Sequence, residues 1–140
     1  MAKIELYIDG SYSPTLETYG SGIVVLQEGE LTHKLSVKGT EPAFNKYHNV
    51  AGEVFASILG LMWVQKNLQD HSDVTVYYDY AGLAKWPSGE WSANNTMSQF
   101  YRDFIRKLPF KVKFAKVRAH SGVTYNELAD KLARGAVGLS

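Results

Sequence analysis

The chain has 140 residues, of which 45% are hydrophobic and 21% are charged, a composition that suits one globular domain with a buried core. It contains no cysteine, which excludes disulfides and thiolate metal sites and fits a reducing, cytoplasmic compartment. Its net charge of +1 does not by itself indicate a nucleic-acid binder. No apolar run could span a membrane and the N-terminus leads straight into a strand, so we expect neither a membrane segment nor a signal peptide.

The first part of the chain predicts three antiparallel strands. Residues 3–8 alternate apolar and polar side chains, as in a strand with one face in a core. Asp9-Gly10-Ser11 then reads as a turn that ends this strand just after a carboxylate. Residues 20–26 are mostly β-branched or apolar, and residues 31–38 alternate again. Short turns separate the three strands, so the pattern predicts an antiparallel meander.

The rest of the chain alternates helices and strands. The first helix is predicted over 49–67 with Asn49 as its N-cap, and Gly52 and Gly60 in it suggest the close approach of another backbone. The elements that follow are a strand over 73–78, a broken segment over 80–91, a helix over 97–108, a strand over 110–117 and a helix from Thr124.

The first helix joins the meander to a later strand, and such a crossover places the fourth and fifth strands parallel to the first. The predicted fold class is therefore α/β, over one domain of residues 1–140. It is a mixed five-stranded sheet, with three antiparallel strands and then two parallel ones, and helices cover both of its faces.

Four carboxylates fall where this fold could bring them together. Asp9 and Asp79 follow strands expected to be parallel neighbours, at the sheet edge where ligand sites of α/β folds form. Glu53 lies in the first turn of the crossover helix, and Asp130 shares a face of the last helix with Asn126. Such a cluster repels itself without a cation, and oxygen ligands favour Mg²⁺ or Mn²⁺ over Zn²⁺. Two such ions about 4 Å apart suit in-line attack on a phosphodiester.

Each of these residues taken singly has a simpler explanation. Asp9 and Asp79 are typical turn residues, and Glu53 suits the first turn of a helix because of the helix dipole. Asp130 could pair with an arginine four residues on, and His120 would ordinarily be an unremarkable loop histidine. Only their joint placement points to a shared site.

Six short motifs follow one another along nearly the whole chain. They are Tyr-Ile-Asp-Gly-Ser at 7–11, Gly-Ser-Gly-Ile-Val at 20–24, Asn-Val-Ala-Gly-Glu at 49–53, Tyr-Tyr-Asp-Tyr at 77–80, Ala-His-Ser-Gly at 119–122 and Tyr-Asn-Glu-Leu-Ala-Asp-Lys-Leu-Ala at 125–133. In this order they resemble the type 1 ribonuclease H family. The resemblance is greatest to the bacterial and phage subgroup with Ala-Gly-Glu on the first helix and a Gly-Glu-Trp element, here at 89–91.

The resemblance implies a ribonuclease H-like fold and an endonuclease that hydrolyses the RNA strand of RNA–DNA hybrids, leaving 5′-phosphate and 3′-hydroxyl ends. It implies two Mg²⁺ ions, for which Mn²⁺ would substitute, and it implies that His120 assists proton transfer or product release. The hybrid is the expected partner, and we expect a monomer that needs no protein partner. The implied metal ligands are Asp9, Glu53, Asp79 and Asp130, and the expected substrate contacts are Gly10, Ser11, Asn49, Trp86, Trp91 and Asn126.

The chain also departs from the family. Where many members have a lysine-rich helix and loop, residues 85–95 contain a single lysine, Lys85. Ala81 and Val50 stand where many members have amides that touch the minor groove, so we expect discrimination of the RNA strand to be looser or to be carried by backbone groups. Two alternatives stay open: a DNA resolvase- or integrase-like nuclease of the same fold, and a non-catalytic hybrid-binding module. The histidine loop and the motif on the last helix disfavour the first, and the complete set of acids disfavours the second.

Overall fold

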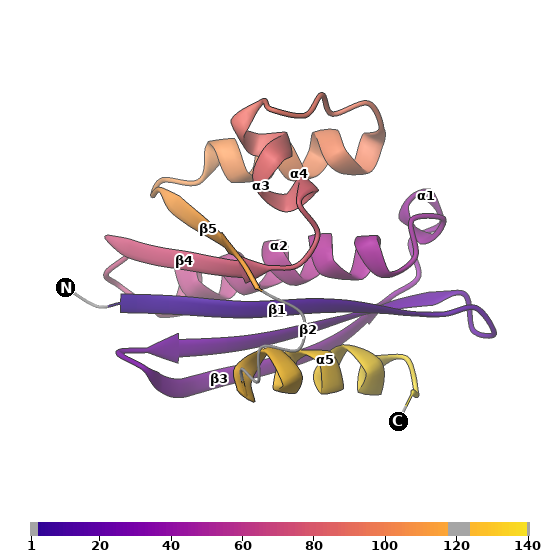
Figure 1. Ribbon diagram of the computed structural model, residues 1–140, viewed down its shortest axis with the longest axis horizontal. Helices are drawn as coiled ribbons and strands as arrows, with labels where there is room; N and C mark the ends of the chain where they lie inside the picture. The colour runs from indigo at the N-terminus through magenta and orange to yellow at the C-terminus, as the bar shows by residue number, and fades with distance from the viewer. Residues whose placement is uncertain (1–2, 118–123, 140) are drawn as a thin grey trace.

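The computed structural model describes residues 3–117 and 124–139, in which five strands form one mixed sheet in the order β3-β2-β1-β4-β5 (Figure 1). The first three strands are antiparallel neighbours, β4 lies parallel to β1, and β5 lies parallel to β4. This arrangement confirms the predicted sheet. The strands are β1 (Lys3–Ser13), β2 (Thr18–Gln27), β3 (Glu30–Gly39), β4 (Asp73–Tyr78) and β5 (Val112–Lys116).

Helices cover both faces of the sheet, as predicted. The long helix α2 (Asn49–Asn67) packs on one face and α5 (Thr124–Ala136) packs on the other (Figure 1). The larger core lies on the α2 side, where α3 (Gly82–Ser88) and α4 (Thr96–Lys107) add their apolar faces. The smaller core lies under α5 and includes Val24 and Leu26 of β2. No helix within the described residues is long and apolar enough to cross a membrane.

The prediction that β1 ends at Asp9-Gly10-Ser11 is wrong. The strand continues to Ser13 and pairs with β2 without interruption from Ile4 to Ser13. The local preference of these residues for a turn is outweighed because the hairpin offers them a continuous row of inter-strand hydrogen bonds. Asp9 therefore lies within the central strand of the sheet.

Two details of the predicted helices also differ. His48, not Asn49, occupies the N-cap position of α2, and a short helix, α1 (Pro42–Asn45), precedes it. The close backbone approach expected at Gly52 is confirmed, since a Cβ there would collide with the carbonyl oxygen of Gly20. At Gly60 the expectation is wrong, because the nearest atoms belong to side chains. The remaining boundaries lie within two residues of those predicted.

Candidate active site

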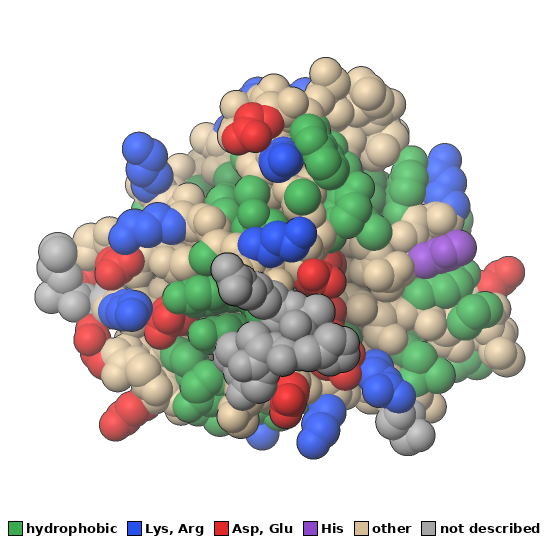
Figure 2. Space-filling model, in the orientation of Figure 1, with side chains coloured by type: hydrophobic (Ala, Val, Ile, Leu, Met, Phe, Trp, Pro, Cys, Tyr) green, Lys and Arg blue, Asp and Glu red, His purple; other side chains and the backbone are tan. Residues whose placement is uncertain are grey.

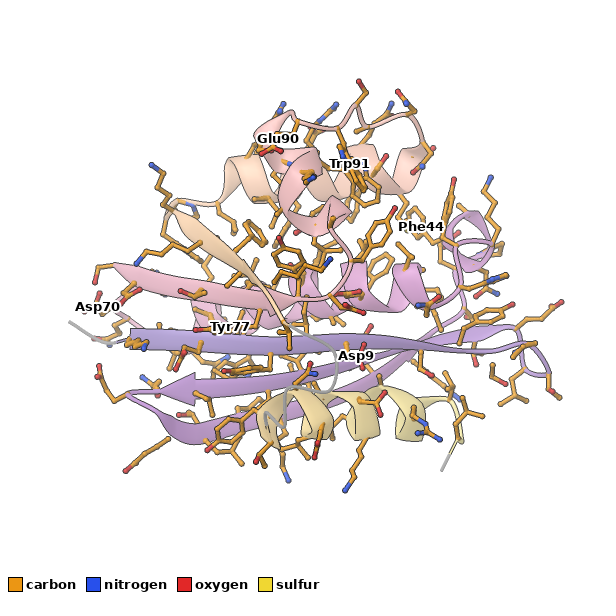
Figure 3. All side chains as sticks on the ribbon, viewed as in Figure 1. Asp9, Phe44, Asp70, Tyr77, Glu90 and Trp91 are labelled. Atoms are coloured by element: carbon orange, nitrogen blue, oxygen red, sulfur yellow. The ribbon has the colours of Figure 1, made fainter. Side chains whose placement is uncertain are left out.

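The register of the sheet places two of the four acids side by side. The parallel pairing of β1 with β4 runs as far as Tyr7 opposite Tyr77. Asp9 and Asp79 each lie two residues beyond that pair, so they occupy equivalent positions where β4 ends and β1 continues. Figure 3 shows Asp9 near the middle of the molecule, at the level where the chain leaves β4.

Glu53 reaches this place because α2 lies directly on β1. A Cβ at Gly10 would overlap the backbone of the first turn of α2, including the amide nitrogen of Glu53, so a glycine is needed for this contact. The Glu53 side chain is only 4% exposed. Its Oε1 accepts hydrogen bonds from the backbone N–H groups of Asp79, at 2.7 Å, and Tyr80, at 3.1 Å. The carboxylate is therefore held against the segment that follows β4.

Asp130 approaches from the opposite face of the sheet. Helix α5 packs closely on β2, where a Cβ at Gly22 would collide with the carbonyl oxygen of Ala129. This contact brings Asp130 close enough to Asp9 for the two carboxyl groups to affect each other's charge. Asp130 also faces Arg134, with Oδ2 and Nη1 3.8 Å apart in a half-exposed i,i+4 pair. The pairing of Asp130 with the arginine four residues on, considered from the sequence, is therefore present, and Asp130 also lies close to Asp9.

Burial and neighbouring charge raise the pKa of two of these acids. Desolvation raises the pKa of Asp9 to about 7, opposed by the Gly10 N–H, and the hydrogen bond with Asp130 and the charges of Glu53 and Asp130 add to the rise. Desolvation likewise raises the pKa of Glu53 to about 7, opposed by the two backbone N–H groups, and the charge of Asp79 adds to it. The four carboxyl groups thus interact as a chain of pairs. Figure 2 shows acidic side chains gathered near the centre of this face of the molecule.

The chemistry of this donor set fits a hard divalent cation. All four side chains offer oxygen, and the burial and neighbouring acids that raise the pKa of Asp9 and Glu53 make their negative charge costly without a cation. Across residues 3–117 and 124–139, no three His, Cys, Asp or Glu side chains are already arranged so that they could hold a metal ion. A cation would therefore draw the pairs together and release the protons that Asp9 and Glu53 retain near pH 7.

The residues expected to contact substrate have different surroundings. Asn49 is exposed at the start of α2. Trp91 is 38% exposed and lies under the Lys85 ammonium, whose Nζ is 5.4 Å from the ring centroid. Trp86 is only 8% exposed and packs against Tyr101 in the larger core. Trp91 is therefore the accessible ring of the two (Figure 3).

The other predicted residues lie close to the acids or outside the described chain. Gly10 and Ser11 continue β1 beyond Asp9, and Asn126 is half-buried in the first turn of α5. His120 lies outside the described residues. The sequence reasoning missed the backbone N–H of Tyr80 as a site group, and no side-chain pattern could have found it because it is a main-chain donor.

The fold and the four acids define an α/β protein of the ribonuclease H-like type, and comparisons with known proteins agree. The family model described as RNase H matches residues 1–138. The ribonuclease H of Prosthecochloris aestuarii is 32% identical and the match covers 96% of this chain and 95% of that one. The ribonuclease H of Trichodesmium erythraeum is 30% identical, over 94% of this chain and 86% of that one. The chain belongs to the ribonuclease H family.

Solved structures show the same fold. RNase H1 from the halophilic archaeon Halobacterium salinarum superposes with a TM-score of 0.75 at 19% identity, covering 96% of this chain and 97% of the other. LC11-RNase H1, in a structure in complex with an RNA/DNA hybrid, gives a TM-score of 0.70 at 20% identity, covering 96% and 99%. The five-stranded mixed sheet with its helices is therefore the ribonuclease H-like fold.

Proposed function

We propose that residues 1–140 form one domain that hydrolyses the RNA strand of RNA–DNA hybrids endonucleolytically, leaving 5′-phosphate and 3′-hydroxyl ends. The observation that carries this proposal is the chain of interactions that links Asp9 to Glu53, Asp79 and Asp130 across two faces of the sheet. Membership of the family supports the substrate class, and a relative of the same fold has been solved in complex with an RNA/DNA hybrid.

The four acids would hold two Mg²⁺ ions, or Mn²⁺ in their place. When bound, such ions activate a water molecule and neutralise charge on the phosphate under attack. Asp9 is the acid best placed to be shared, because it interacts with both Glu53 and Asp130. Glu53 presents a fixed oxygen because two backbone N–H groups hold its Oε1. Both acids must lose a proton to hold a cation, so at subsaturating Mg²⁺ cleavage should rise with pH toward about 7.

The hybrid would lie across the face that carries the acids. Asn49 and Asn126, at the first turns of α2 and α5, would supply amides, and the backbone of Gly10 and Ser11 beyond Asp9 would contact the nucleic acid. Trp91 offers an exposed ring on which the DNA strand could stack. Trp86 is less suited to this role because it is buried. His120 would assist proton transfer or product release. We propose that the protein acts as a cytoplasmic monomer without an obligatory protein partner.

One assay tests this proposal against its rivals. Labelled RNA–DNA hybrid, duplex DNA and duplex RNA are each incubated with the protein in Mg²⁺, Mn²⁺ or EDTA. Cleavage of the RNA strand of the hybrid alone, with either cation but not with EDTA, is the expected result. Cutting of duplex DNA would identify a resolvase-like nuclease instead. Hybrid binding without cleavage in any cation would identify a non-catalytic module.

A further inference from the structure

Helix α3 contains a proline where its first turn needs a hydrogen-bond donor. Pro87 lies inside this helix and has no backbone N–H. In an α-helix the N–H of residue 87 would donate to the carbonyl oxygen of Leu83, one turn earlier. Leu83 is fully buried, so water cannot replace the missing donor. The carbonyl group of Leu83 therefore needs a donor from another part of the protein.

The hydroxyl of Tyr101 supplies this donor. Tyr101 belongs to α4, which packs against α3, and its Oη donates to the carbonyl oxygen of Leu83 at 2.6 Å (Figure 1). Tyr101 is fully buried, and burial raises its pKa above the ordinary value, so the hydroxyl keeps the proton that it donates. The Oγ of Ser57 on α2 lies 3.4 Å from the same Oη. Because the tyrosine proton points to Leu83, the serine is the donor in that second pair, and one hydroxyl links three helices.

Both ends of this link lie close to the proposed metal site. Ser57 is one turn after Glu53 on α2. The backbone N–H of Leu83 donates to the carbonyl oxygen of Tyr80. The two N–H groups that hold Oε1 of Glu53 belong to Tyr80 and to the residue before it. The segment between β4 and α3 is thus tied to α2 at two points, by the carboxylate of Glu53 and by the hydroxyl of Tyr101.

We propose that Tyr101 is a positioning residue for the metal site: its hydroxyl replaces the N–H that Pro87 lacks and holds the segment after β4 against α2. This inference rests on the proposed function and names a residue outside the four acids on which cation binding depends. Tyr101 is fully buried, so it takes no part in the chemical step and acts through Asp79 and the N–H groups that orient Glu53. Removing groups that orient metal ligands typically lowers metal affinity or activity by about 10- to 100-fold.

The first variant is Tyr101→Phe, which keeps the ring in the core and removes the hydroxyl. We expect its Kd for Mn²⁺, measured by isothermal titration calorimetry, to rise about tenfold. At a fixed, subsaturating Mg²⁺ concentration its kcat should fall about tenfold, whereas its KM for the hybrid should stay within about twofold of the parent because no nucleic-acid contact is lost. A variant that binds Mn²⁺ and cleaves hybrid like the parent would overturn the inference.

A matched control separates positioning from a general loss of stability. Tyr19→Phe removes the hydroxyl of another buried tyrosine of the larger core, one that stacks on Phe55. It should keep the Kd for Mn²⁺ and the kcat of the parent, even where its Tm falls as far as that of Tyr101→Phe. An equal loss of Mn²⁺ affinity in the two variants would overturn the positioning role, because the loss would then follow from stability alone.

A second substitution restores the missing donor by another route. Pro87→Ala gives residue 87 an N–H that can donate to Leu83, and it keeps the carbonyl oxygen of residue 87, which accepts from Nε of Arg106 at 3.1 Å. Alone, this substitution should change the Kd for Mn²⁺ by less than about twofold. Added to Tyr101→Phe, it should return that Kd to within about threefold of the parent. Without such a recovery, Tyr101 does not act through the carbonyl group of Leu83 and the inference fails.

The calorimetry and the cleavage assay also separate this inference from the function on which it rests. A parent that neither binds Mn²⁺ nor cleaves hybrid would refute the proposed function and the role of Tyr101 together. A parent that does both, with an unchanged Tyr101→Phe variant, would refute the role of Tyr101 alone.

Discussion

Replacing Asp9 by asparagine tests both the site and its electrostatics. Asp9 has an ordinary pKa of 3.8, which burial and neighbouring acids raise to about 7 in the folded protein. Between these values the folded state holds a proton that the unfolded state has lost, so stability is complete below about pH 4 and falls as pH rises through about 7. For a group fully shielded from water, a pKa rise of this size would lower the free energy of unfolding by about 4 kcal/mol. Asp9 is half-buried and partly screened by water, so we expect a cost of about 2 kcal/mol above pH 7.

The asparagine side chain carries no charge and can still accept the hydrogen bond from the Gly10 N–H, so Asp9→Asn should avoid this cost. In EDTA at pH 8, Asp9→Asn should be more stable than the parent by about 2 kcal/mol, or about 6 °C in Tm. At pH 4 the two proteins should unfold at the same temperature. Adding Mg²⁺ at pH 8 should stabilise the parent more than the variant, because only the parent keeps all four acids. Thermal unfolding followed by circular dichroism measures each of these.

The same variant should not cleave the hybrid, since one lost charge weakens every pair in which Asp9 takes part. Glu30→Gln, a neutral substitution of an exposed acid on β3, is the control and should match the parent in both assays. Near-normal turnover by Asp9→Asn would remove the four-acid site from the proposal. Equal stability of variant and parent at pH 8 would show that burial and Asp130 do not disfavour the Asp9 charge.

Three further outcomes are expected. Gly10→Ala should lower the free energy of unfolding by at least about 2 kcal/mol in denaturant titrations, because its Cβ would overlap the backbone of α2; unchanged stability would contradict that packing. His120→Ala should lower kcat by roughly 10- to 10⁴-fold with little change in hybrid affinity, and loss of affinity at constant kcat would assign it to substrate contact instead. Lysines at Ser92 and Asn94 would supply the missing basic charge, and Asn95 is left unchanged because it caps α4. The double-lysine variant should lower KM for the hybrid and steepen the slope of log K against log salt concentration by about 0.9 for each new phosphate contact. A parent that already binds tightly with a steep slope would contradict this expectation.

The sequence by itself determined the order and type of the main elements and the set of candidate acids. Alternation over 31–38 and helical periodicity over 49–67 are local patterns, and each is fixed by which side chains can face a core. The crossover between the meander and β4 then required parallel pairing, so the proximity of Asp9 and Asp79 followed from connectivity. The short motifs indicated the ribonuclease H family, and the comparisons confirm it.

Only the tertiary structure decided how these residues are held. Asp9-Gly10-Ser11 has the local chemistry of a turn, yet it is a strand because β2 pairs with it along its whole length and α2 rests on Gly10. Trp86 and Trp91 look alike in the sequence, but one is buried and the other is open. Glu53 is fixed by main-chain donors, and its raised pKa comes from burial among distant segments. Local patterns carry no information about such contacts, because they arise only when remote parts of the chain exclude water together.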